Sequence, residues 1–197
     1  EAGRVTSVYG PPPRMRRAEI EAVVAAVRGL PRARALVIGG STPRVELYPA
    51  LCALDMPVVL DCKGEALLAA LDACDAILAK PNLQECRATF GVETAREAAE
   101  VLRSKGVRSS IITDGAGPAL FTCPEIQLEA HPPVVQVEHT VGCGDALCAG
   151  YLFAKSRGPR RAAAFAMACG AWAASDPGVA NLNRAECEAL VEQVRFS

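Results

Sequence analysis

Residues 140–150 read Thr-Val-Gly-Cys-Gly-Asp-Ala-Leu-Cys-Ala-Gly, a glycine-rich turn that opens a helix of small residues. Gly142 and Gly144 leave backbone N–H groups free to point outward, and the helix behind them adds partial positive charge at the same point. Such a turn can hold an anion, and the carboxylate of Asp145 can accept a proton from an attacking hydroxyl. An anion site beside a base is the minimum equipment for moving a phosphoryl group onto an alcohol.

Upstream of this turn, short apolar segments alternate with helical patterns. The sequence predicts strands at 35–38, 57–60, 76–79 and 109–113 and helices at 18–30, 45–54, 64–71 and 94–105. Short apolar strands separated by helices favour a parallel sheet that is covered on both faces. We therefore expect an α/β fold of three layers, α/β/α, around a mostly parallel central sheet.

The rhythm changes after Gly115. Three short, antiparallel strands are expected, at 119–122, 125–129 and 134–137. The helix of the glycine turn follows at about 145–155, and two more helices close the chain at 160–174 and 184–194. The proline cluster at 9–13 predicts a rigid segment before the first helix.

Composition narrows the class of protein. With 197 residues and a net charge of −1, the chain is expected to form one domain, residues 1–197, that binds no nucleic acid. No apolar run is long enough to span a membrane, and the opening residues show no signal-peptide pattern. Nine cysteines, none in a C-x-x-C, fit a reducing cytoplasm, and two histidines are too few for a zinc site.

A second candidate site is Lys80-Pro-Asn-Leu-Gln-Glu85, which follows a predicted buried strand. In one interpretation Asn82 and Glu85 are only the capping box of a helix. In the other, these two side chains lie one turn apart and hold water around Mg²⁺, while Lys80 meets a phosphate. The carboxyl edge of an open α/β sheet is where ligands bind, so both interpretations stay open.

Two more glycine segments follow predicted strands. Thr113-Asp-Gly-Ala-Gly117 is either a plain turn or a loop under a nucleotide, where Gly115 and Gly117 permit close backbone approach. Gly39-Gly-Ser41 either leads to a helix capped by Ser41 or Thr42, or lines the cleft for an acceptor substrate.

Familiar nucleotide signatures are absent from the sequence. There is no G-x-x-x-x-G-K-[ST], and Leu147 takes the third glycine position of a G-x-G-x-x-G. What remains is Gly-x-Gly-Asp at the start of a helix.

Together these segments resemble the ribokinase-like (PfkB) family of sugar kinases. The sequence Thr140-Val-Gly-Cys-Gly-Asp145 resembles the family's T-x-G-A-G-D signature, and Asn82-x-x-Glu85 its N-x-x-E magnesium motif. Thr113-Asp-Gly115 resembles the family's nucleotide-contacting S/T-x-G loop. Residues 39–43 resemble its G-S-L-P turn, and Leu60-Asp61 resembles the strand that follows that turn. The combination of Lys80-Pro-Asn82 with Thr140-Val-Gly142 favours the branch of this family that contains 1-phosphofructokinase and tagatose-6-phosphate kinase.

The resemblance implies a role for each motif. Asp145 would be the base that deprotonates a sugar hydroxyl, and the amides of Gly142, Cys143 and Gly144 would stabilise the transferring phosphate. ATP and Mg²⁺ would be required: the metal acts with Asn82 and Glu85, and the adenine lies near 169–173, beginning at Cys169. The nucleotide would also meet Lys80, Thr113, Gly115 and Gly117.

Some features depart from the family pattern. Members are longer, and the part that would precede 6–12, the N-terminal third with most of the sugar pocket, is missing. The chain is then a fragment, a relative without sugar phosphorylation, or one that another chain completes. An incomplete sheet is expected to expose an apolar edge and to favour homo-oligomers. Glu138-His139 replaces the usual Asn/Asp-Thr, which puts activation by a monovalent cation in doubt.

Cys143, which replaces the usual alanine, has two interpretations: a tolerated small residue, or a thiol whose pKa the helix terminus lowers.

Three functions are weighed against one another. The first is an ATP-dependent kinase acting on a sugar or sugar phosphate, with fructose 1-phosphate or tagatose 6-phosphate as leading acceptors. The second is a truncated, non-catalytic nucleotide-binding module. The third, a structural domain without ligand, is disfavoured because several glycine sites share one sheet edge.

Overall fold

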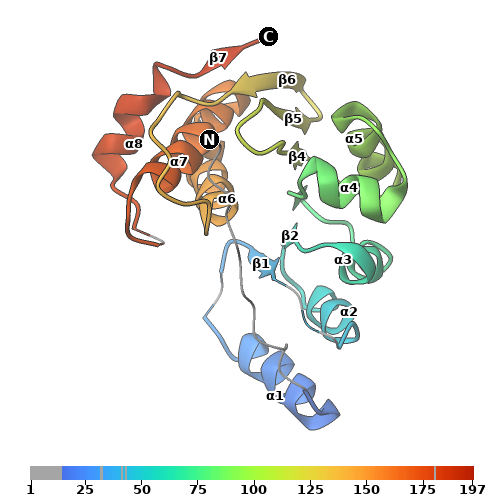
Figure 1. Ribbon diagram of the computed structural model, residues 1–197. Coiled ribbons are helices and arrows are strands. Elements are labelled where there is room, and N and C mark those ends of the chain that lie inside the picture. Colours follow the sequence, from blue (N-terminus) through green and yellow to red (C-terminus); the bar gives the residue numbers. More distant parts are fainter. Residues whose placement is uncertain (1–14, 32, 41, 43, 180) are drawn as a thin grey trace.

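The structure, a computed structural model, describes residues 15–31, 33–40, 42, 44–179 and 181–197. Seven strands form one sheet in the order β1-β2-β3-β4-β5-β6-β7, with helices on both faces (Figure 1). The α/β fold in three layers that the sequence predicts is confirmed.

The first half of the sheet is parallel. Its strands pair in chain order, each pair parallel: β1 (Leu36–Gly39), β2 (Val58–Asp61), β3 (Leu78–Ala79) and β4 (Ser110–Ile112). Since parallel neighbours need a crossover, helices connect them: α2 (Leu47–Cys52), α3 (Gly64–Leu71), and the pair α4 (Leu83–Phe90) and α5 (Ala95–Ser104). All four strands therefore end at the same edge of the sheet.

The second half is antiparallel and differs from the prediction at one strand. β5 (Ala119–Cys123) and β6 (Ile126–His131) pair as expected, but 134–137 form no strand. Pro132 and Pro133 lack N–H donors and end the ladder, and Val134 is 89% exposed. The strand that pairs with β6 is instead β7 (Arg195–Phe196), which follows the last helix.

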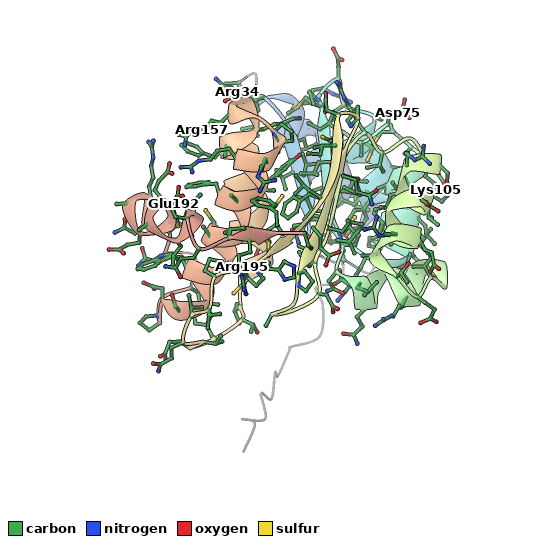
Figure 2. All side chains as sticks on the ribbon, turned by 90° about the horizontal axis from the view of Figure 1, so that it is seen from above. Arg34, Asp75, Lys105, Arg157, Glu192 and Arg195 are labelled. Carbon is green, nitrogen blue, oxygen red and sulfur yellow. The ribbon has the colours of Figure 1, made fainter. Side chains whose placement is uncertain are left out.

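Alternate strand residues supply two separate cores. Val58 and Leu60 pack among the helices α2–α5, whereas Val59 between them packs on the opposite face with α6 (Cys143–Ala154), α7 (Pro159–Ser175) and α8 (Arg184–Val191). Figure 2 shows the two layers, with Lys105 on one side of the sheet and Glu192 on the other. A short 3₁₀ helix, Lys155–Arg157, joins α6 to α7, and α1 (Arg17–Arg28) packs at the β1 end of the first layer (Figure 1).

The turn after β1 does not cap a helix through Thr42. The N-cap of α2 is Glu46, while the hydroxyl of Thr42 accepts a hydrogen bond from the Arg44 amide at 3.3 Å. The hydroxyl of Tyr48 bridges this turn, donating to the carbonyl of Gly40 at 3.1 Å. Ser41, Pro43 and the proline cluster at 9–13 lie outside the described residues.

Among the helices of the described residues, none combines the length and the apolar character needed to cross a membrane. All nine cysteines are free, and burial raises the pKa of Cys62 and Cys86 to about 12. These buried thiols act as small apolar side chains, as the sequence predicts.

Candidate active site

The carboxyl ends of the parallel strands bring separate motifs together. Asp61 is the last residue of β2, Lys80 follows β3, and Thr113 follows β4. The backbone joins the last two segments, since the N–H of Leu83 donates to the Thr113 carbonyl at 2.8 Å and Asn82 forms a parallel bridge with Thr113. The sequence-predicted motifs on β3 and β4 therefore share one edge of the sheet.

Lys80 is a buried cation at this edge. Only 6% exposed, it places its Nζ 2.9 Å from Oδ1 of Asp61. A methyl group added at Gly144 would lie 3.0 Å from the same Nζ. The ammonium therefore sits between the end of β2 and the first turn of α6, a contact that no spacing in the sequence reveals.

α6 begins with an uncapped glycine turn. Gly142 is its N-cap with φ of +78°, a left-handed conformation that glycine adopts without strain, and no side chain caps the first amides. The N–H of Ala146 is the first to bond within the helix, to the Gly142 carbonyl at 2.9 Å. Among the described residues, the backbone N–H groups of Gly144 and Asp145 have no backbone partner, whereas the Cys143 N–H donates to the Thr140 carbonyl at 3.5 Å. Binding of an anion by the amides of 142–144 remains a prediction.

Asp145 is exposed in this first turn. Burial raises the pKa of Asp61, Lys80 opposes that rise, and the negative charges of Asp145 and Glu85 add to it. Asp145 and Glu85 therefore both lie close enough to Asp61 to raise its pKa, and Lys80 lies close enough to lower it.

Asn82 and Glu85 form the capping box of α4. The Glu85 N–H donates to Oδ1 of Asn82 at 2.8 Å, and the Asn82 N–H donates to Oε2 of Glu85 at 3.1 Å. The structural interpretation of this motif is thus confirmed. The other oxygen of Glu85 faces Lys63 at 3.6 Å on an open, exposed side. Its metal role remains a prediction.

The donor set of Asn82 and Glu85 fits Mg²⁺ only if water and substrate phosphates supply the remaining ligands. In the part of the chain that the structure describes, no three His, Cys, Asp or Glu side chains are grouped to hold a metal ion by themselves. Mg²⁺ commonly binds one or two carboxylates and completes its shell with water and substrate phosphates. A partly hydrated ion at the second oxygen of Glu85 would have to displace Lys63, whose Nζ lies 3.6 Å from that oxygen.

The loop after β4 is a tight glycine turn. Gly115 has φ of +56°, and a side chain at Gly117 would approach the Asp114 carbonyl to 2.9 Å. Both glycines are therefore needed for the turn itself. Thr113, half-buried, and the exposed Gly115 lie beside Asn82, and their contact with a nucleotide remains a prediction.

The surroundings of Cys143 contradict one expectation, and those of Cys169 leave another open. Burial raises the pKa of the Cys143 thiol, so the hypothesis of a lowered pKa is wrong. Cys169 is 2% exposed and lines a cavity of about 340 Å³ between α6, α7 and the start of α8, together with Gly150 and Phe153. A role of Cys169 near an adenine would be that of a cavity wall, and it remains a prediction.

Sequence reasoning missed two site features. The sequence analysis places Asp61 only in a strand, although a carboxylate at the end of a buried parallel strand is itself a signal for a site. The ring nitrogens of His139 are buried without a hydrogen-bond partner among the described residues, while the amides of Glu138 and His139 donate to the Ala174 carbonyl at 2.8 and 3.3 Å.

Comparison with known proteins identifies the family. The sequence pattern of the pfkB family carbohydrate kinases matches residues 49–186. The chain belongs to the pfkB family. Its motifs at Asn82–Glu85, Thr113–Gly117 and Thr140–Asp145 all lie within the matched region.

Individual relatives agree with this family assignment. A 1-phosphofructokinase of Vibrio cholerae is 30% identical over all of this chain and 67% of its own length, and one of Rhodobacter capsulatus is 37% identical over 60% of this chain and 41% of its own. A crystal structure of phosphofructokinase-2 from Escherichia coli in complex with potassium superposes with a TM-score of 0.78 at 25% identity, covering 89% of this chain and 62% of that one. The matched region thus spans about two thirds or less of each relative.

Proposed function

We propose that this chain is the nucleotide-binding and catalytic portion of an ATP-dependent kinase that phosphorylates a hydroxyl of a sugar or sugar phosphate. The observation that carries the proposal is the exposed Asp145 carboxylate in the uncapped first turn of α6, with Lys80 against that turn. The names of the pfkB relatives favour a 1-phosphofructokinase-like acceptor, fructose 1-phosphate or tagatose 6-phosphate.

Asp145 is the proposed general base. A carboxylate in the first turn of a helix can accept the proton of an acceptor hydroxyl as the oxygen attacks the terminal phosphate. The amide of Gly144 and the positive end of α6 would face the charge on the transferring group, and the Cys143 amide would join them only by leaving the Thr140 carbonyl. Phosphoryl transfer passes through a loose transition state, so positioning and charge neutralisation supply most of the acceleration.

The nucleotide is proposed to lie along the carboxyl edge of β3 and β4. Lys80 faces its phosphates, Thr113, Gly115 and Gly117 contact it by close backbone approach, and Cys169 lines the wall of the neighbouring cavity. Asn82 and Glu85 would hold Mg²⁺, partly through water. When bound, this ion neutralises phosphate charge.

Asp145→Asn tests the proposal. We expect ADP release from ATP, assayed against a panel of sugar phosphates, to fall about 10³-fold, because the base is lost while the shape of the turn remains. Affinity for ATP–Mg²⁺ by calorimetry should stay within a few-fold. The matched control is Asp75→Asn, an exposed carboxylate that precedes β3 at the opposite end of the strands (Figure 2). Equal turnover in the two variants would refute Asp145 as the base.

A second candidate function is nucleotide binding without transfer. It is favoured by the fraction of each relative that the chain spans, since residues outside the matched region can carry the acceptor pocket. Heat of ATP–Mg²⁺ binding with no ADP release for any acceptor would select this alternative. The absence of any binding heat would instead remove both functions.

A further inference from the structure

Lys80 occupies an unusual position for a cation. A buried ammonium is costly unless it is paired, and the positive end of a helix repels it further. Yet Lys80 is 6% exposed, and its Nζ lies 3.0 Å from the point where a side chain on Gly144 would begin, in the first turn of α6. Something must hold it there.

Asp61 is the contact that offsets this cost. Its Oδ1 lies 2.9 Å from Nζ of Lys80, within the range of a charge-assisted hydrogen bond, and its side chain is 17% exposed. Asp61 is itself crowded by the negative charges of Asp145 and Glu85, so the ion pair with Lys80 is the interaction that favours its charged form.

The exposed Lys–Asp pair of the other helical layer provides a comparison. Nζ of Lys105 lies 3.2 Å from Oδ1 of Asp72, but the two side chains are 34% and 72% exposed. That pair resembles ordinary surface ion pairs, whereas the Asp61–Lys80 pair is enclosed between β2 and α6.

We propose that Asp61 is a positioning residue for the turn at Gly142–Asp145: it acts through Lys80, whose ammonium it fixes beneath Gly144, so that a positive charge is in place before a phosphate arrives. The identity of that phosphate, the one carried by ATP, rests on the proposed function. The position of the charge does not, because it follows from contacts within the chain.

Hydrogen exchange tests the position of the turn without any ligand. In Lys80→Met and in Asp61→Asn, we expect the α6 amides from Ala146 onward to exchange about 5-fold faster or more than in the parent, because the support beneath the first turn is lost. Peptides from β4 and β5 should keep their parent rates in the same samples, and Lys105→Met should leave every peptide unchanged. Unchanged α6 exchange in Asp61→Asn would overturn the proposal.

Calorimetry with ATP–Mg²⁺ tests whether Asp61 acts through Lys80. Lys80→Met should weaken binding about 10-fold or more, and Asp61→Asn about 3- to 10-fold. In the Lys80→Met background, Asp61→Asn should cause no further loss, because there is no ammonium left to hold. An equal loss from Asp61→Asn in both backgrounds would show that Asp61 acts independently of Lys80.

These two experiments separate the inference from the proposed function. If the parent chain does not bind ATP–Mg²⁺, the proposed function fails, and the exchange of α6 alone decides the role of Asp61. Lys80→Met leaves Asp61 unpaired and for that reason could fail to fold. In that case the double variant Asp61→Asn/Lys80→Met, which leaves neither charge of the pair, takes the place of Lys80→Met and is compared with Asp61→Asn alone.

Discussion

A thiol in the first turn of a helix is subject to two opposite effects. The positive end of the helix stabilises the thiolate, while burial destabilises it. At Cys143 burial is the larger effect and raises the pKa, although a backbone hydrogen bond opposes it. The thiol also lies close enough to the His139 carbonyl, at 3.8 Å, to donate a weak hydrogen bond that favours the protonated form. The thiol is therefore mostly protonated at neutral pH.

We expect iodoacetamide to label Cys143 at pH 7 more slowly than it labels a cysteine in a short unstructured peptide, because less thiolate is present. Peptide-resolved mass spectrometry of the folded chain measures the rate, and the urea-unfolded chain provides the control, in which all nine cysteines should react alike. Labelling of Cys143 ahead of the peptide standard would contradict the raised pKa.

Single residues also mark the limit of prediction from the sequence. The capping box of Asn82 and Glu85 was predictable because both partners lie within one turn. The pairing of Asp61 with Lys80 depends on the register of β2 with β3, and the contact of Lys80 with Gly144 on the packing of α6 over the sheet. No local pattern encodes distances between elements.

At the scale of elements, α6 and α7 approach closely at a glycine. A methyl group at Gly150 would lie 2.8 Å from Sγ of Cys169 and 3.2 Å from the Cα of Ala166. The second neighbour is backbone, which cannot yield as a flexible side chain can. Alanine at this position therefore has to push the two helices apart.

Gly150→Ala should lower the free energy of unfolding by about 1–2 kcal/mol, because overpacking outweighs the helix propensity gained. Chemical denaturation measures the change. Adding Cys169→Ala removes the closest contact and should restore part of the loss, whereas Cys169→Ala alone should be destabilising. A more stable Gly150→Ala variant would mean that the helices separate freely here.

Ion pairs connect α8 to α7 and to the 3₁₀ helix before it. Glu188 accepts hydrogen bonds from Arg157 at 2.8 Å and from Arg161 at 2.6 Å, and these partners lower its pKa. A carboxyl whose pKa is lower in the folded state stabilises the fold above its unfolded pKa and loses that effect as the pH falls through the folded value.

Glu188→Gln should therefore reduce stability by about 1 kcal/mol at pH 7, with the difference from the parent shrinking as the pH falls below about 4. Thermal unfolding across that pH range provides the measurement. The control is Glu192→Gln, whose side chain is 85% exposed with one contact to Arg161 at 3.4 Å, and it should change little at any pH (Figure 2). A pH-independent effect of Glu188→Gln would assign its role to packing.

The whole molecule combines a parallel and an antiparallel half, and these were not equally predictable. The strands from 35 to 113 were recognisable because each is a short apolar run between helices. The two-residue β7 was not, because Arg195 and Phe196 carry no strand pattern and owe their conformation to the open edge of β6. The prediction of a strand at 134–137 was wrong although the residues have a strand pattern, because the two prolines before them cannot continue a ladder.

In the part of the chain that the structure describes, the opposite edge of the sheet, at β1, has no neighbouring strand. Among the described residues β1 pairs only with β2, and Val37 in its centre is 49% exposed. An uncovered strand edge offers unpaired N–H and C=O groups to another chain, and apolar side chains add to the attraction. We expect sedimentation velocity to show concentration-dependent self-association of this chain.

Val37→Lys should shift the chain toward the monomer, because a charge on an edge strand opposes pairing. Val134→Lys is the matched control: it makes the same chemical change at a residue that is 89% exposed and lies in no strand. If both lysines disperse the chain equally, its association arises from general surface hydrophobicity. A parent chain that stays monomeric at high concentration would mean that the short β1 edge is too small to pair, and the sheet would then need no partner at this side.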